Sequence, residues 1–166
     1  FVGTPAGGVW RSYDGGANWE SNTDDLLTLG VSAIAFDPND ADVIYIGTGD
    51  RDAADSPGMG VMKSVNGGDS WEFINTGMES LTVGSLIVKS DETNVILAGT
   101  NDGIFRSVDF GSTWEFVSED AADYRTLLVK PDDTNVMYAT ASGKFFRSED
   151  AGQNWQWTTG GLYGAY

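Results

Sequence analysis

The chain repeats one eight-residue stretch, whose third copy reads Ser107-Val108-Asp109-Phe110-Gly111-Ser112-Thr113-Trp114. The tryptophans that end the four copies lie 52, 43 and 41 residues apart. Repetition at a period of about 20–50 residues is typical of proteins in which one supersecondary unit stacks on copies of itself. This stretch, called the signature below, therefore predicts a repeat architecture. Its four copies are residues 12–19, 64–71, 107–114 and 148–155.

Each repeat also contains four short apolar runs rich in Val, Ile, Phe, Tyr and Trp, and turn residues bound these runs. The runs of the second repeat are residues 31–36, 43–46, 60–64 and 71–74, and the two later repeats match them. Such runs are typical of strands and turns, and no helical periodicity competes with them. We therefore predict an all-β fold, a β-propeller whose blades are four-stranded antiparallel sheets.

The blade boundaries follow from the same alignment. The first interval is long because residues 47–60 stand where the third repeat has only 99–103. About four blades are visible, and one reading closes them into a four-bladed ring. The absence of a turn that would join the two ends, and ends that fall inside a blade, favour a part of a larger propeller. The predicted division is a partial blade over 1–30, blades over 31–80, 81–121 and 122–160, and the start of a further blade over 161–166.

The signature resembles the Asp-box, or BNR repeat, Ser-x-Asp-x-Gly-x-Thr-Trp. This repeat occurs in sialidases, sortilin-type receptors, xyloglucanase-type glycoside hydrolases and the photosystem II assembly factor. The stretch Ile44-Tyr45-Ile46-Gly47-Thr48-Gly49-Asp50 is most similar to large secreted or surface propellers of the sortilin and xyloglucanase type. The resemblance covers nearly the whole chain and implies the blade fold far more specifically than an activity.

The signature residues are expected to be structural. The Asp can accept hydrogen bonds from its own turn, the Gly suits a left-handed backbone, and the Trp is large enough to bury its ring on the blade. The assigned residues are Ser12, Asp14, Gly16 and Trp19; Ser64, Asn66, Gly68 and Trp71; Ser107, Asp109, Gly111 and Trp114; Ser148, Asp150, Gly152 and Trp155.

The composition excludes some classes of binding partner. The net charge is −16, which disfavours nucleic acid and anionic lipid as partners. The chain has neither Cys nor His, and it has no apolar run long enough for a membrane span. We expect a solvated acidic surface on an extracellular or cell-surface bacterial protein, with no cofactor; calcium is the one ion left open.

The charged residues do not single out an enzyme. A sialidase needs three converging arginines, but Arg11, Arg106 and Arg147 share one repeat position with Lys63, which leaves only Arg51 and Arg125 unique. A xyloglucanase-type hydrolase needs two carboxylates across a cleft, and acidic residues are too plentiful to choose a pair. No catalytic residue is therefore assigned. The carboxylates outside the repeat positions are Asp24, Asp25, Asp50, Asp52, Asp55, Glu79, Asp120 and Asp123.

The most individual segment is the insertion after residue 49. Its side chains Asp50, Arg51, Asp52 and Asp55 could bind calcium or a sugar, because long loops on rigid repeats often carry binding function. The alternative is a solvated loop or a contact with a neighbouring domain. Residues 37–42 alternate like a calcium loop but are predicted to form an ordinary turn. Among other aromatics, Trp10 and Trp157 align with apolar strand residues and are predicted to lie in the core, while Tyr163 and Tyr166 are left open.

These observations favour a non-enzymatic binding or scaffolding propeller of a secreted or cell-surface bacterial protein. Its loops would face a protein or glycan partner, or neighbouring domains of the same longer chain. The alternative is part of a xyloglucanase-type hydrolase that acts on β-glucans. An assembly-factor propeller is less favoured, because the resemblance implies an arginine-rich binding surface and this chain is acidic.

Overall fold

The computed structural model describes residues 1–21, 23–24, 26–50, 56–78 and 81–158. Within these ranges the chain forms fifteen strands and no helix, which confirms the prediction of an all-β fold. The strands are β1 (Val2–Gly3), β2 (Val9–Arg11), β3 (Glu20–Ser21), β4 (Val31–Asp37), β5 (Asp40–Thr48), β6 (Val61–Ser64), β7 (Glu72–Phe73), β8 (Val83–Val88), β9 (Ile96–Thr100), β10 (Gly103–Ser107), β11 (Glu115–Phe116), β12 (Tyr124–Lys130), β13 (Asp133–Ala141), β14 (Lys144–Ser148) and β15 (Gln156–Trp157).

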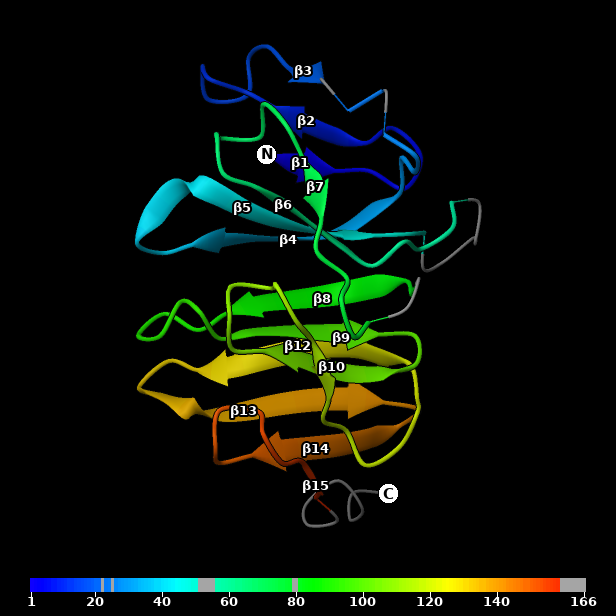
Figure 1. Ribbon diagram of the computed structural model, residues 1–166, viewed down its shortest axis with the longest axis vertical. Coiled ribbons are helices and arrows are strands. Elements are labelled where there is room, and N and C mark those ends of the chain that lie inside the picture. The colour runs from blue at the N-terminus through cyan, green and yellow to red at the C-terminus, as the bar shows by residue number, and fades with distance from the viewer. Residues whose placement is uncertain (22, 25, 51–55, 79–80, 159–166) are drawn as a thin grey trace, which may run out of the picture.

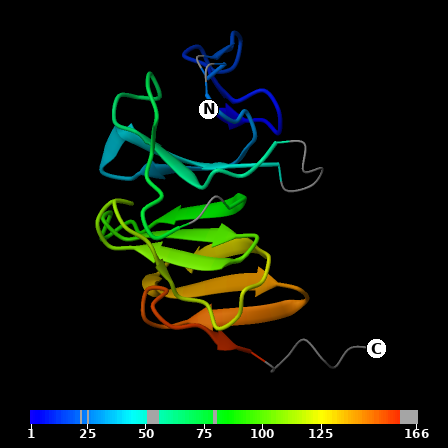
Figure 2. The same ribbon diagram turned by 45° about the vertical axis from the view of Figure 1, so that its right-hand side comes forward.

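The strands form four antiparallel sheets, each a simple meander in chain order. Sheet 1 contains β1–β3, sheet 2 contains β4–β7, sheet 3 contains β8–β11 and sheet 4 contains β12–β15. The sheets stack face to face in chain order, with sheets 1 and 4 at opposite ends (Figures 1 and 2). This is the arrangement of successive propeller blades, as predicted from the repeat. Residues 161–166, which would start a further blade or close a ring, lie outside the described residues.

The hydrophobic core lies between the sheets, because successive side chains of a strand point to opposite faces. In β10, Phe105 packs with Tyr45 and Val61 of sheet 2. Its neighbour Ile104 points the other way and packs with Tyr124 and Phe146 of sheet 4. A smaller cluster joins sheets 1 and 2. Each sheet is therefore stabilised chiefly by its neighbours.

Glycines allow the sheets to approach closely near their inner strands. A Cβ atom on Gly3, Gly47 or Gly99 would lie 2.8 Å from the carbonyl oxygen of the first residue of the next inner strand. Sheet 4 has Thr140 at the corresponding position, and it is exposed. The glycine thus appears at each of the three described junctions between sheets.

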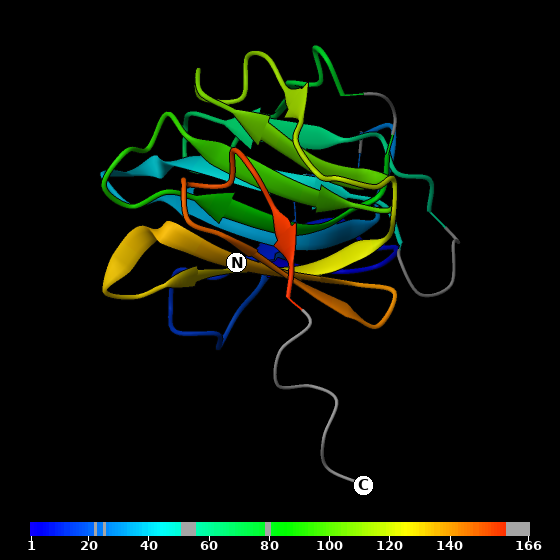
Figure 3. The same cartoon turned by 90° about the horizontal axis from the view of Figure 1, so that it is seen from below.

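The stack has two different rims. The signature rim carries the signature hairpins and the turns between the first and second strands. The insertion rim, on the opposite side, carries the turns between the second and third strands, including the described residues 49–50, 56–60 and 142–143 (left and right in Figure 1). The view from below shows sheet 4 with no other described sheet in front of it (Figure 3).

Candidate functional site

The polar side chains of the signature bond within their own hairpin. In the third copy, Ser107 Oγ donates to Asp109 Oδ1 at 2.8 Å and accepts from the Gly111 amide at 2.9 Å. The Asp109 carboxylate also accepts from the Thr113 amide at 2.8 Å and the Thr113 hydroxyl at 2.7 Å. The copies that begin at Ser12, Ser64 and Ser148 repeat this arrangement. The polar side chains of the signature therefore stabilise their own hairpin.

The backbone of the hairpin is left-handed at two successive positions. The fifth position is always Gly, with φ between 78° and 92°. The fourth position also has positive φ and is Phe110 and Ala151 in the last two copies, at 60° and 57°. A non-glycine residue there is strained. The amides of Phe110 and Ala151 donate to Asn94 and Asn135, which anchors the strained residue to the turn between the first two strands.

The hydrogen bonds also lower the pKa values of the signature carboxyls. The side chain and then the amide of Asn18, followed by the Ser12 hydroxyl, lower the pKa of Asp14 to about 2. The Thr113 hydroxyl and amide hold the pKa of Asp109 below its ordinary value. Burial acts to raise the pKa of Asp150, but the bonds from Asn154 and Ser148 outweigh it and the net shift is downward.

Acid should therefore destabilise the fold through these carboxyls. Their pKa values are lower in the folded chain than the ordinary 3.8, so the unfolded chain takes up protons first as the pH falls. The stabilisation that these carboxyls contribute to the free energy of unfolding should be fully present above about pH 4 and be lost progressively toward pH 2. Urea unfolding curves between pH 7 and pH 2 would measure this loss.

A matched pair of variants separates charge from hydrogen bonding at Asp109. Asn66 in the second copy accepts from the Ser70 amide at 3.0 Å without a charge, so Asp109→Asn should keep the hairpin and reduce the acid sensitivity. Asp109→Ala removes the acceptor and should cost about 1–2 kcal/mol at neutral pH. An unchanged slope of stability against pH in Asp109→Asn would contradict a role for this carboxylate.

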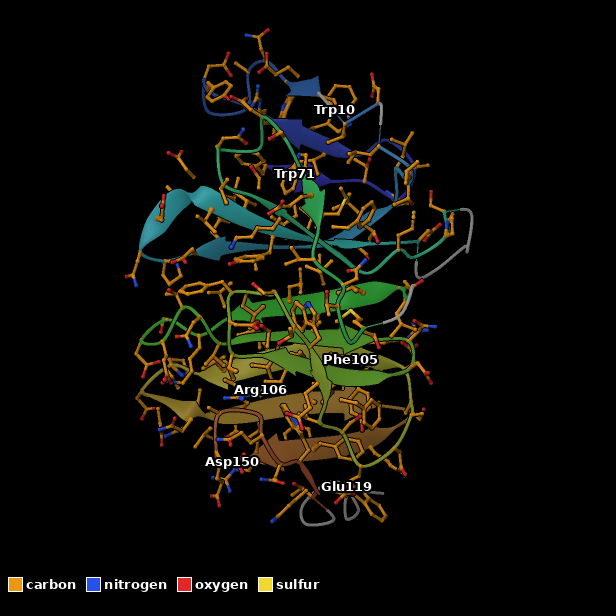
Figure 4. The ribbon with its side chains drawn as sticks, viewed as in Figure 1. Trp10, Trp71, Phe105, Arg106, Glu119 and Asp150 are labelled. Atoms are coloured by element: carbon orange, nitrogen blue, oxygen red, sulfur yellow. The ribbon has the colours of Figure 1, made fainter. Side chains whose placement is uncertain are left out.

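The repeated cation before each signature joins one sheet to the next. Arg11 Nη1 lies 3.5 Å from the Gly67 carbonyl, Lys63 Nζ 3.4 Å from the Phe110 carbonyl, and Arg106 Nε 3.0 Å from the Ala151 carbonyl. Each acceptor is the fourth signature residue of the following sheet (Arg106 and Asp150 are labelled in Figure 4). Arg11 also pairs with Glu20 and Asp69. These cations do not converge on one ligand.

The signature tryptophans differ in burial although their sequences match. Trp114 and Trp155 are 5% and 3% exposed and pack against the preceding sheet, whereas Trp19 is 44% exposed. The Trp114 ring nitrogen donates to the Ile74 carbonyl of sheet 2 at 2.6 Å. The expectation that each ring is largely buried is therefore wrong for Trp19, because no described sheet precedes sheet 1.

The core predictions for Trp10 and Trp157 are wrong. Trp10 (labelled in Figure 4) is 38% exposed, whereas its counterparts Met62 and Phe146 are 2% and 1% exposed because each packs against the preceding sheet. Trp157 is 48% exposed, and its counterpart Phe116 is 44% exposed, because the fourth strand lies at the outer edge of each sheet. Alignment alone did not distinguish the covered strands from the outer one.

The insertion is firmly anchored where it leaves the sheet. The Gly49 amide donates to the Gly30 carbonyl at 2.8 Å, and the Asp50 amide donates to the Ser56 carbonyl at 2.9 Å. The Thr28 hydroxyl donates a hydrogen bond to the Pro57 carbonyl at 2.9 Å. Of the four predicted binding residues, only Asp50 is described; Arg51, Asp52 and Asp55 lie outside the described residues.

A groove on the same insertion rim gathers charged residues that do not recur. It has a volume of about 400 Å³, and Arg125 and Asp123 at its edge pair through Nε and Oδ2 at 2.6 Å. Lys144 also lines it, 3.4 Å from Asp120 and 5.4 Å from the centroid of the Trp157 ring. The sequence marked Arg125 and both aspartates as non-repeating, but it did not place them together with the 141–145 turn.

The described residues show neither a cluster of metal ligands nor a membrane-spanning helix. No group of three or more acidic side chains there is arranged to hold a metal ion. The described part of the chain also offers no helix of the length and apolarity that a bilayer crossing requires.

Comparison with known proteins supports the fold. No family model and no curated protein matches the sequence. Among solved structures, an ancestral GH74 enzyme superposes with a TM-score of 0.78 at 23% identity, and the GH74 xyloglucanase from Xanthomonas campestris with 0.74 at 24%. Both matches cover 95% of this chain, which spans only 22% and 28% of those chains. YCF48 bound to D1 peptide matches 76% of this chain and 40% of its own length, with a TM-score of 0.56 at 15% identity. The chain therefore has the fold of a β-propeller segment.

Proposed function

We propose that this chain is a non-enzymatic binding and scaffolding segment of a β-propeller built from Asp-box repeats. In this proposal the signature is the Asp-box, and the protein is secreted or displayed on a bacterial cell surface. The acidic composition, with a net charge of −16, supports a solvated exterior. The partner is a glycan or a protein bound at the insertion rim.

One observation carries the proposal: recurring and non-recurring polar residues are used differently. The signature carboxylates bond inside their hairpins, and Arg11, Lys63 and Arg106 bond the next sheet. By contrast, Arg125, Asp123 and Lys144 do not recur and line an open groove on the opposite rim. Ligand sites on repeat proteins commonly lie on loops held by a rigid scaffold.

The chemistry of the groove favours a glycan over a peptide. Trp157 is not part of the groove lining, but it is half-exposed and the groove residue Lys144 lies 5.4 Å from the centroid of its ring, and an exposed indole suits the apolar side of a sugar ring. Arg125 supplies donors and Asp123 acceptors that match the alternating donors and acceptors of sugar hydroxyls. A few convergent polar groups beside an aromatic surface are typical of a small-molecule subsite.

Glycan binding should depend on these side chains. We expect a glycan array to identify a ligand, and Arg125→Ala and Trp157→Ala each to weaken its binding about tenfold or more, measured by titration calorimetry. Lys130→Ala is the matched control, since Lys130 forms a similar exposed pair with Asp132 on the signature rim. Equal losses of affinity in all three variants, or no binding to any glycan of the array, would contradict a glycan site in the groove. No binding to any glycan would favour a protein partner.

The likeness to GH74 enzymes supports one alternative, that the chain is part of a glycoside hydrolase acting on β-glucans. Such an enzyme requires a pair of carboxylates facing each other across a cleft. An assay for new reducing ends with xyloglucan separates the two functions. If the chain releases reducing ends, and Asp120→Asn or Asp123→Asn abolishes the release, the chain is part of a hydrolase and the non-enzymatic proposal is wrong.

A further inference from the structure

The second signature contains the one Asn-Gly pair of the sequence, Asn66-Gly67. An Asn that precedes Gly is prone to spontaneous deamidation, because Gly has no Cβ atom to hinder the attack of its amide nitrogen on the Asn side chain. The other three signatures have Asp at the third position, namely Asp14, Asp109 and Asp150. Deamidation of Asn66 would therefore give the second signature the side chain of the other three.

The reaction needs water and no other reagent. The Gly67 nitrogen attacks the Asn66 Cγ atom, and the new C–N bond closes a succinimide ring while the Nδ2 group leaves with the Gly67 proton as ammonia. Water then breaks one of two C–N bonds of the ring. Cleavage of the new bond at Cγ gives Asp, whereas cleavage of the original main-chain bond gives isoaspartate, in which the main chain runs through Cγ and is one methylene longer.

The folded hairpin holds each reacting group in a hydrogen bond. The Gly67 amide donates to the Asp42 carbonyl at 2.9 Å, and Asn66 Nδ2 donates to Ser70 Oγ at 2.9 Å. Asn66 Oδ1 accepts from Ser64 Oγ at 2.9 Å and from the Ser70 amide at 3.0 Å. Ring closure removes the Gly67 proton and releases Nδ2, so it breaks the first two of these bonds. The fold therefore opposes the reaction, although Asn66 is exposed to water.

The same two positions are less reactive in the other signatures, for two different reasons. The third and fourth copies have Phe110 and Ala151 at the fourth position, and their side chains hinder the attack. The first copy has Gly15 there, but the hydrogen bonds from Asn18 lower the pKa of Asp14 to about 2. An ionised carboxylate is a poor target for a nucleophile. The second copy combines an uncharged side-chain amide with a following Gly.

The hairpin fits only one of the two products. In the third signature the Asp109 carboxylate accepts from the amide and the hydroxyl of Thr113, and Ser70 offers both groups at the same place in the second signature. An Asp therefore fits there. Isoaspartate adds a methylene to the main chain between Ser64 and Gly68, whose hydroxyl and amide are bonded at 2.9 Å, so the turn no longer closes.

We infer that Asn66-Gly67 is a site of spontaneous deamidation that the folded second signature keeps unreactive. The site reacts when the hairpin separates from Asp42 at the start of β5. Afterwards the fold accepts the Asp product and rejects isoaspartate. Because a hairpin on the rim opens locally at a lower free energy than the whole chain unfolds, the reaction depends on the opening of this hairpin.

Peptide mapping by mass spectrometry, with electron-transfer fragmentation to distinguish Asp from isoaspartate, measures the reaction at mildly alkaline pH. We expect Asn66 to react at least about tenfold faster in urea than in the folded chain. Ser64→Ala removes the bonds to Asn66 Oδ1 and to the Gly68 amide, so it should accelerate the reaction without urea about tenfold. Ser107→Ala is the matched control, because Ser107 makes the same bonds in the third signature, and it should leave the rate at Asn66 unchanged.

Two further variants keep the test independent of a folding defect. Circular dichroism shows whether Ser64→Ala folds, and Ser70→Ala is a milder change that removes the acceptor of Asn66 Nδ2 and should accelerate the reaction about threefold. Gly67→Ala gives the second signature the fourth residue of the last signature and should suppress the reaction in urea.

The products are sorted by refolding the chains that reacted in urea and separating compact from expanded chains by size-exclusion chromatography. The compact fraction should contain Asp at position 66, and isoaspartate should collect in the expanded fraction. Equal rates in the folded chain and in urea, no reaction in urea, equal acceleration by Ser64→Ala and Ser107→Ala, or isoaspartate in the compact fraction would each overturn the inference.

Discussion

Trp114→Ala should destabilise the chain by about 3–5 kcal/mol, whereas Trp19→Ala should cost about 1 kcal/mol or less. Trp114 is 5% exposed and packs with Tyr45 and Val61 of the preceding sheet. Its ring nitrogen bonds the Ile74 carbonyl, so the substitution leaves both a cavity and an unpaired carbonyl. Trp19 has the same place in its signature but is 44% exposed.

Urea unfolding of the two variants measures the difference between a contact within a hairpin and a contact between sheets. The Trp19 ring nitrogen donates to the Gly16 carbonyl at 3.0 Å, inside its own turn. If the indole acted only on its own hairpin, the two substitutions would cost similar free energies. Equal midpoint shifts would therefore contradict the conclusion that the signature Trp fastens each sheet to the one before it.

The second large effect is expected for Gly77→Ala, which should lower the free energy of unfolding by about 3 kcal/mol or more. Gly77 has φ of 88°, and a Cβ atom there would overlap the carbonyl oxygen of Trp114. The neighbouring Thr76 carbonyl accepts from the Trp114 amide at 2.8 Å, so this backbone cannot withdraw without breaking a contact between sheets 2 and 3. Positive φ costs about 1–2 kcal/mol for Ala, and overpacking adds about 1–3 kcal/mol.

Gly15→Ala is the matched control for this position. Gly15 has φ of 73°, but nothing lies within 4 Å of an added Cβ atom. Its cost, about 1–2 kcal/mol, isolates the backbone strain. The excess in Gly77→Ala then measures the steric overlap with sheet 3. If chemical denaturation gave the same loss for both variants, the linker after β7 would not be packed against Trp114 as described.

Much of the fold was predictable because its signals are local. The runs that alternate between turn residues and apolar residues predicted four strands per repeat, and the described sheets agree. A β-hairpin forms among neighbours in the chain, so its sequence contains most of what determines it. The candidate groove was only partly predictable. Arg125 and Asp123 were marked as non-recurring, but the groove they line is also formed by residues 140–145, which are the adjoining ends of β13 and β14 and the turn between them.

The errors share one physical cause. Trp10 and Met62 occupy equivalent positions, yet Trp10 is 38% exposed and Met62 is 2% exposed. Burial of this position depends on a preceding sheet, whose residues are some 40 positions away in the chain and are not visible in the local pattern. Trp157 is exposed because its strand lies at the outer edge of the sheet, and this position is likewise decided by packing that the local pattern does not show.

The sequence by itself determined the repeating unit, which has four strands and a strained turn. Within the eight residues of that turn, the Ser hydroxyl, the Asp or Asn side chain and the Gly amide form hydrogen bonds with one another. The tertiary structure alone decided how the units join, namely that Arg106 reaches the Ala151 carbonyl and that Trp114 reaches the sheet before it. Hydrogen bonds inside a turn are set by residues already adjacent. Contacts between sheets require two distant repeats to pack, and only their packing removes the indole and the guanidinium from water.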